Sequence, residues 1–70
     1  MITIIDPFGN QIQLDFYQGM TTNQALEKAQ VIFDRLDIVL LNQERIIPPP
    51  FETEVEDKST IRVLRIVSGG

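Results

Sequence analysis

The sequence predicts one small α+β domain in which a single helix packs on one face of a mixed sheet of four or five strands. Three observations predict this class. The chain has 70 residues, 43% of them hydrophobic, which suffices for one core and leaves no room for a second. Only one stretch has the spacing of an amphipathic helix, whereas several short segments have the character of strands. Because one helix cannot cover both faces of such a sheet, two layers are expected.

The first two strands are expected at the N-terminus. Residues 1–5 (MITII) are largely β-branched and aliphatic, and residues 6–10 (DPFGN) are rich in turn-forming residues. Residues 11–16 (QIQLDF) alternate polar with apolar side chains, so the apolar ones share one face. These segments predict a β-hairpin.

The helix is expected at residues 22–33. Thr21 and Gln24 have the T-x-x-Q spacing of a capping box, in which the two side chains bond to each other's backbone N–H groups. Apolar residues then recur at helical spacing, with polar residues on the other side. We expect the helix to pack on the sheet through Leu26, Ala29, Ile32 and Phe33.

Three further strands are expected in the second half of the chain. Residues 38–41 (IVLL) are apolar on both faces, as in the middle of a sheet. A polar turn separates them from a short strand at Ile46 and Ile47, which ends at three prolines and therefore belongs at a sheet edge.

The next segment, residues 51–57, is expected to be irregular and to be anchored in the core by Phe51 and Val55. A last strand should run from Thr60 to about Val67. The helix then connects the second and third strands, and the first and last strands can lie together, parallel, in the middle of the sheet. This is the β-grasp arrangement, expected over residues 1–67, with residues 68–70 as a flexible tail.

Composition excludes several classes of function. The chain has no Cys and no His, which removes thiolate nucleophiles, cysteine-based zinc sites and Ser-His-Asp triads. Its net charge of −4 argues against nucleic-acid binding, and it has no apolar run long enough to cross a membrane. We therefore expect a cytoplasmic protein that is not an enzyme and holds no metal or cofactor. The acidic residues of one loop lack the spacing of a calcium site and are expected in solvent: Glu52, Glu54, Glu56 and Asp57.

The chain ends in Ser68, Gly69 and Gly70. Such an end has two interpretations: an ordinary frayed terminus, or a reactive carboxylate that must enter the narrow site of another enzyme. Glycine suits the second role because it lacks Cβ, so its backbone can approach an enzyme closely.

Two segments carry a resemblance to a known family. Residues 60–70 (TIRVLRIVSGG) resemble the end of ubiquitin-like proteins, and more closely the small bacterial sulfur carriers of thiamine biosynthesis (ThiS) and their molybdopterin relatives (MoaD). Residues 38–48 (IVLLNQERIIP) are similar to the strand–Asn–turn–strand–Pro segment of the thiamine carriers. One departure is Asp57-Lys-Ser59, where the family often has Asp-Gly-Asp.

The resemblance implies a carrier on which partner enzymes act. A ThiF/MoeB-like adenylyltransferase would use Mg-ATP to convert the Gly70 carboxylate into an acyl-adenylate. A sulfur donor, often a cysteine persulfide, would then displace AMP and leave a thiocarboxylate on Gly70. Thiazole synthase or another acceptor would receive the sulfur. ATP and magnesium would be bound by the partner and not by this chain.

The last strand is also expected to provide a docking face. Alternation places Ile61 and Val63 on the core side, and Arg62, Leu64 and Ile66 on the other side. Apolar side chains on an open sheet face beside the tail would suit partner binding. The alternative is a β-bulge that turns Leu64 into the core. Whichever pair faces outward would extend the docking face, Ile38 and Leu40 or Val39 and Leu41.

Three alternatives to a thiamine sulfur carrier stay open. Two belong to the same superfamily: a molybdopterin-type carrier, and a protein modifier whose Gly70 is joined to lysines. The third is a non-covalent β-grasp interaction module whose tail has no chemical role; a chain that ends at the second glycine disfavours it.

Overall fold

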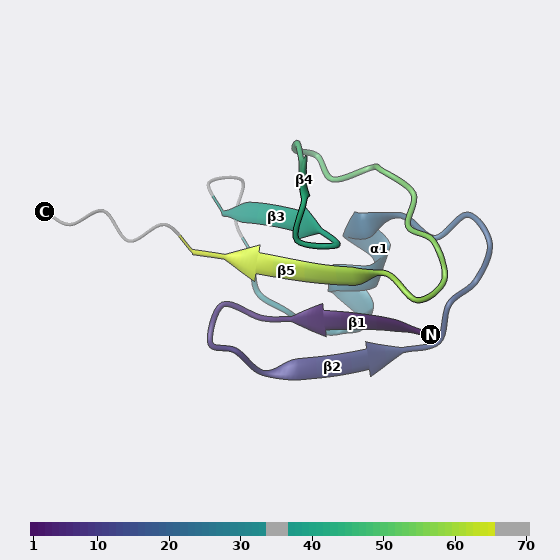
Figure 1. The fold of residues 1–70 in the computed structure, drawn as a ribbon, viewed down its shortest axis with the longest axis horizontal. Coiled ribbons are helices and arrows are strands. Elements are labelled where there is room, and N and C mark those ends of the chain that lie inside the picture. The colour runs from purple at the N-terminus through teal and green to yellow at the C-terminus, as the bar shows by residue number, and fades with distance from the viewer. Residues whose placement is uncertain (34–36, 66–70) are drawn as a thin grey trace, which may run out of the picture.

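The computed structural model describes residues 1–33 and 37–65, and in these residues it contains one helix and five strands (Figure 1). All five strands form one mixed sheet in the order β2-β1-β5-β3-β4. The predicted α+β class is therefore confirmed. The elements are β1 (Ile2–Ile5), β2 (Gln11–Leu14), α1 (Thr22–Lys28), β3 (Ile38–Leu41), β4 (Arg45–Ile47) and β5 (Thr60–Leu64).

The centre of the sheet is the parallel pair β1 and β5, in which Thr3 lies opposite Thr60 and Ile5 opposite Arg62. This confirms that the first and last strands are adjacent and parallel. Strands β2 and β3 pair antiparallel with β1 and β5 respectively, and β4 forms an edge beside β3, as the prolines predicted. The helix α1 lies across one face of the sheet, behind it in Figure 1.

The turn between β1 and β2 is built by Asp6. Its carboxylate accepts hydrogen bonds from the backbone N–H of Phe8 at 2.9 Å and of Asn10 at 2.8 Å. Gly9 completes the turn with φ of +89°, a conformation that glycine adopts without a Cβ clash. The predicted hairpin is thus confirmed, with β2 ending at Leu14 and not at Phe16.

The helix begins as predicted but ends earlier. Both bonds of the capping box form: Thr21 Oγ1 accepts from Gln24 N at 3.2 Å, and Gln24 Oε1 accepts from Thr21 N at 3.1 Å. The prediction that the helix continues to residue 33 is wrong. Gln30 has φ of +59° and donates to the Glu27 carbonyl, while Val31 donates to that of Leu26. This is the Schellman pattern that ends a helix, here without the usual glycine.

The early end of α1 changes which side chains face the sheet. Leu26 is fully buried, and Ala29 and Phe33 are partly buried against the core, as expected. Ile32 is 83% exposed, so the prediction that it packs on the sheet is wrong, because the chain has left the helix two residues earlier.

The core lies between α1 and the sheet, and it includes Ile61, Val63, Phe51 and Val55, each at the buried position expected for it. The long connection before β5 is tied to the start of the helix. The backbone N–H groups of Thr22 and Asn23 donate to the carbonyls of Thr53 and Phe51, both at 2.8 Å. These bonds satisfy donors that the first turn of a helix leaves without internal partners.

The turn between β3 and β4 joins two parts of the sheet. Asn42 and Gln43 both have positive φ, of 54° and 62°, which asparagine tolerates better than most residues. Asn42 N donates to the Thr60 carbonyl at 2.7 Å, and Asn42 Oδ1 accepts from Thr60 N at 2.9 Å. The asparagine that carried the family resemblance therefore extends the pairing of β3 with β5 by one residue.

Candidate functional site

The sheet face opposite α1 is partly apolar, and the register shows which residues form it. Val39 lies opposite Val63 and both are buried, so their neighbours along the strands point to the other side. Ile38 lies opposite Leu64, and Leu40 opposite Arg62. Of the two pairs considered, Ile38 and Leu40 therefore face outward. We call the following residues the outer sheet face: Ile5, Ile38, Leu40, Ile46, Arg62 and Leu64.

Leu64 belongs to the outer sheet face and not to the core. The pairing of β3 with β5 runs in unbroken register from Ile61 to Leu64, so the described part of β5 has no bulge. The bulge interpretation is therefore wrong. Leu64 is half-buried beside Ile38, and Ile66, the third predicted docking residue, lies outside the described residues.

Arg62 lies in the middle of the outer sheet face, between Ile5 of β1 and Leu40 of β3. Its side chain is exposed, and within residues 1–33 and 37–65 no ion pair involves it. Ile46 of β4, opposite Leu40, is 64% exposed although it is aliphatic. The face thus presents one cation surrounded by aliphatic side chains.

The predicted reactive tail lies outside the described residues: Ser68, Gly69 and Gly70. Strand β5 ends at Leu64, so the prediction that it continues to about Val67 is wrong, and Arg65 is the last described residue. Gly70 follows Arg65 by five residues, and five residues span at most about 18 Å when fully extended.

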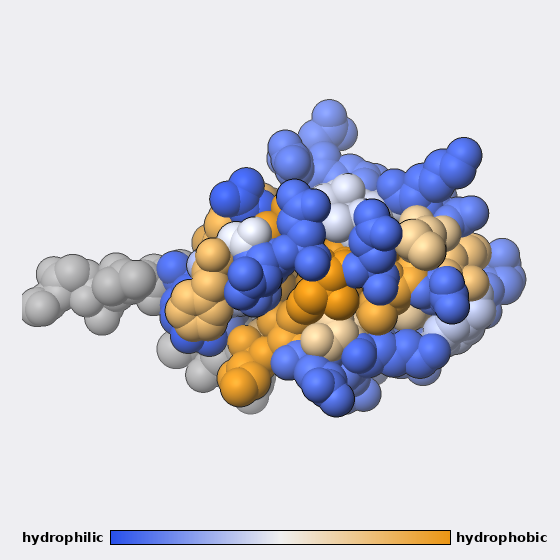
Figure 2. All heavy atoms as spheres, turned by 90° about the horizontal axis from the view of Figure 1, so that it is seen from below, coloured by the Kyte–Doolittle hydropathy of each residue, from blue (hydrophilic) through white to orange (hydrophobic). Residues whose placement is uncertain are grey.

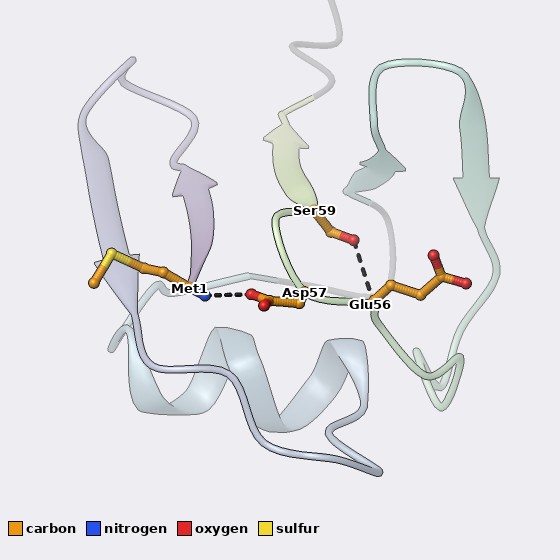
Figure 3. A network of polar contacts seen from close by, with 4 residues as sticks. All are labelled: Met1, Glu56, Asp57 and Ser59. Carbon is orange, nitrogen blue, oxygen red and sulfur yellow. Dashed lines mark hydrogen bonds and ion pairs between the residues drawn. The ribbon is translucent and has the colours of Figure 1, made fainter.

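The acidic loop takes part in structural contacts. The amino group of Met1 donates to Asp57 Oδ1, and Glu56 N donates to Ser59 Oγ at 3.3 Å (Figure 3). The hydrogen bond from the Met1 ammonium group lowers the pKa of the Asp57 carboxyl. No group of three or more acidic residues in the described part of the chain is placed to hold a metal ion.

Phe8 and Ile32 are exposed near the end of β5, and the sequence did not predict that they lie there. Phe8 was expected only as part of a turn, and Ile32 as part of the packed helix face. Both lie beside Arg65, which contacts the Phe8 ring and the Ile32 carbonyl. No local signal in the sequence predicts this, because the three residues come together only through the register of the sheet.

No protein-family model, curated protein or solved structure matches this chain. Among the described residues, no helix is both long and apolar enough to span a bilayer.

Proposed function

We propose that this chain is a cytoplasmic sulfur carrier with a β-grasp fold, similar to the ThiS carriers of thiamine biosynthesis. The observation that carries the proposal is the place of β5: the central strand, parallel to β1, leads within six residues of Leu64 to the terminal Gly70. The strand order and the helix between β2 and β3 support a β-grasp fold. Strand β5, which precedes the proposed reactive end, is hydrogen-bonded to a neighbouring strand on both sides.

The proposed chemistry takes place at the Gly70 carboxylate. A carboxylate oxygen attacks the α-phosphorus of ATP in a ThiF/MoeB-like partner, and pyrophosphate leaves with the magnesium ion. This step converts a poor leaving group into AMP, and the partner stabilises the developing charge. The sulfur of a donor persulfide then attacks the acyl carbon and AMP leaves. A second thiol of the donor breaks the S–S bond, which leaves a thiocarboxylate on Gly70 and a disulfide on the donor.

The outer sheet face is proposed as the docking site for the adenylyltransferase. Its aliphatic side chains supply area for burial, and Arg62 requires an acidic residue on the partner, since a buried unpaired cation is costly. Most binding energy in such interfaces comes from a few central residues. Leu64 is a good candidate because it lies next to Ile38 and near the reactive end.

Leu64→Asp is expected to raise the KM for the carrier in adenylation about tenfold or more, because a carboxylate replaces a central apolar contact. Its cost in unfolding free energy should be about 1 kcal/mol or less, since Leu64 is only half-buried. Gln13→Asp is the matched control: it adds the same charge on the same sheet side, at edge strand β2. Loss of folding in Leu64→Asp, measured by circular dichroism, would contradict the placement of this residue.

The function itself is tested by intact-mass spectrometry. The full chain is incubated with a ThiF-like enzyme, ATP, magnesium and a persulfide donor. We expect one terminal oxygen to be replaced by sulfur. Transfer of this sulfur to thiazole synthase supports the thiamine pathway, and transfer to molybdopterin synthase supports the molybdopterin alternative. Attachment of Gly70 to lysines would identify a protein modifier instead, and no reaction with any partner would favour a non-covalent module.

A further inference from the structure

Arg65, the first residue after β5, makes three contacts with other parts of the chain. Its Nη2 donates to the Ile32 carbonyl at 3.4 Å, and its Nε lies 3.9 Å from Asp37 Oδ1. The guanidinium carbon lies 5.6 Å from the centroid of the Phe8 ring, within the range of a cation–π contact. The end of β5 is thus attached both to the β1–β2 turn and to the connection between α1 and β3.

The register of the sheet explains why these segments meet. Strands β1 and β5 are parallel with Ile5 opposite Arg62, so the turn after β1 lies level with the end of β5. Strand β3 is antiparallel to β5 with Ile38 opposite Leu64, so the segment that enters β3 begins at the same edge. Figure 1 shows this edge at the arrowheads of β1 and β5.

Two large apolar side chains are exposed at this edge. Ile32 is 83% exposed and Phe8 is 78% exposed, more than the other large hydrophobic residues in the described part of the chain. They border a hollow of about 150 Å³, and apolar surface at this end of the molecule is visible in Figure 2. Exposed apolar side chains that gather at one place are typical of interaction sites. We call Phe8, Ile32 and Arg65 the C-terminal edge.

We propose that the C-terminal edge is a second contact surface for the enzyme that activates Gly70, separate from the outer sheet face. This inference rests on the proposed function. Five residues follow Arg65 in the sequence, and five residues span at most about 18 Å when fully extended. An enzyme that encloses the terminal carboxylate must therefore come close to Arg65, and there it meets Phe8 and Ile32.

The chemistry of the edge indicates what the enzyme presents there. The carboxylate of Asp37 already lies near the Arg65 guanidinium. A carboxylate from the enzyme is therefore not required to neutralise the charge of Arg65. Phe8 and Ile32 offer exposed apolar surface next to Arg65. The complementary surface of the enzyme should accordingly be apolar, in contrast to the acidic residue expected opposite Arg62.

The test is the double variant Phe8→Ser/Ile32→Ser, with Phe8→Leu/Ile32→Val as the conservative control. Thiocarboxylate formation by the ThiF-like enzyme is measured over a range of carrier concentrations. We expect the serine variant to raise the KM about tenfold with kcat little changed, and the control to stay close to the wild type. Both variants should keep the urea midpoint of the wild type, because the replaced side chains are exposed.

The outcomes separate this inference from the proposed function. If the wild-type chain is not activated, the proposed function fails and this inference fails with it. If the wild type is activated and the serine variant has an unchanged KM, whatever its kcat, only the role of the C-terminal edge is overturned. A loss of self-association in the serine variant, seen by sedimentation with KM unchanged, would assign the edge to a second copy of this chain instead.

Discussion

Deletion of Gly70 is expected to abolish thiocarboxylate formation and to leave the free energy of unfolding unchanged. The shortened chain ends in a carboxylate that no longer reaches the α-phosphate, and a displacement of about 1 Å can already cost on the order of 100-fold in rate. Among the described residues, Val63 is the last that belongs to the core, and glycine has no side chain to lose. A domain of this size has about 3.5–10 kcal/mol of stability, and even a small loss would be visible.

The measurement is intact-mass spectrometry of both chains after the same incubation, with urea denaturation in parallel. Ser68→Ala is a suitable comparison, because it changes a tail residue and keeps the length of the tail. It should retain most of the activation. Equal sulfur incorporation in the shortened chain would contradict the role of Gly70 and favour a module whose tail has no chemical role.

Ile61→Ala is expected to have the largest effect on stability. Ile61 is fully buried on β5, where it lies opposite Ile4 of β1 and Leu41 of β3. Replacement of a buried isoleucine by alanine costs about 2–5 kcal/mol, through lost burial and the cavity that remains. Since a domain of this size is stabilised by only about 3.5–10 kcal/mol, the variant should unfold at a clearly lower urea concentration than the wild type.

Urea denaturation followed by circular dichroism measures this effect. The matched control is Arg62→Ala, one residue further along β5 but on the outer sheet face, where an exposed substitution should stay within about ±0.5 kcal/mol. Equal destabilisation by the two variants would contradict the alternation of β5. Arg62→Ala is also expected to weaken binding to the adenylyltransferase, so the two positions separate stability from function.

Local patterns in the chain were sufficient for much of the fold. The alternation in residues 11–16, the capping box at Thr21 and the prolines after Ile47 each act over a few residues, and each prediction was confirmed in its main feature. The parallel pairing of β1 with β5 also followed, because one helix between the second and third strands leaves few ways to complete a sheet. The predicted docking residues Arg62 and Leu64 follow from the same alternation.

The apolar pattern of the sequence did not predict the end of the helix or the contacts between distant segments. Apolar spacing continues to Phe33, yet Gln30 adopts a positive φ and α1 ends at Lys28, so Ile32 is exposed. The periodicity of apolar residues does not predict this end of the helix, because a Schellman pattern without glycine has no clear signature in the sequence. Only the pairing register turned Ile38 and Leu40 outward and brought Phe8, Ile32 and Arg65 together. Residues that are distant in sequence meet by hydrogen bonding between strands, and a pattern within one segment carries no information on its partner strand.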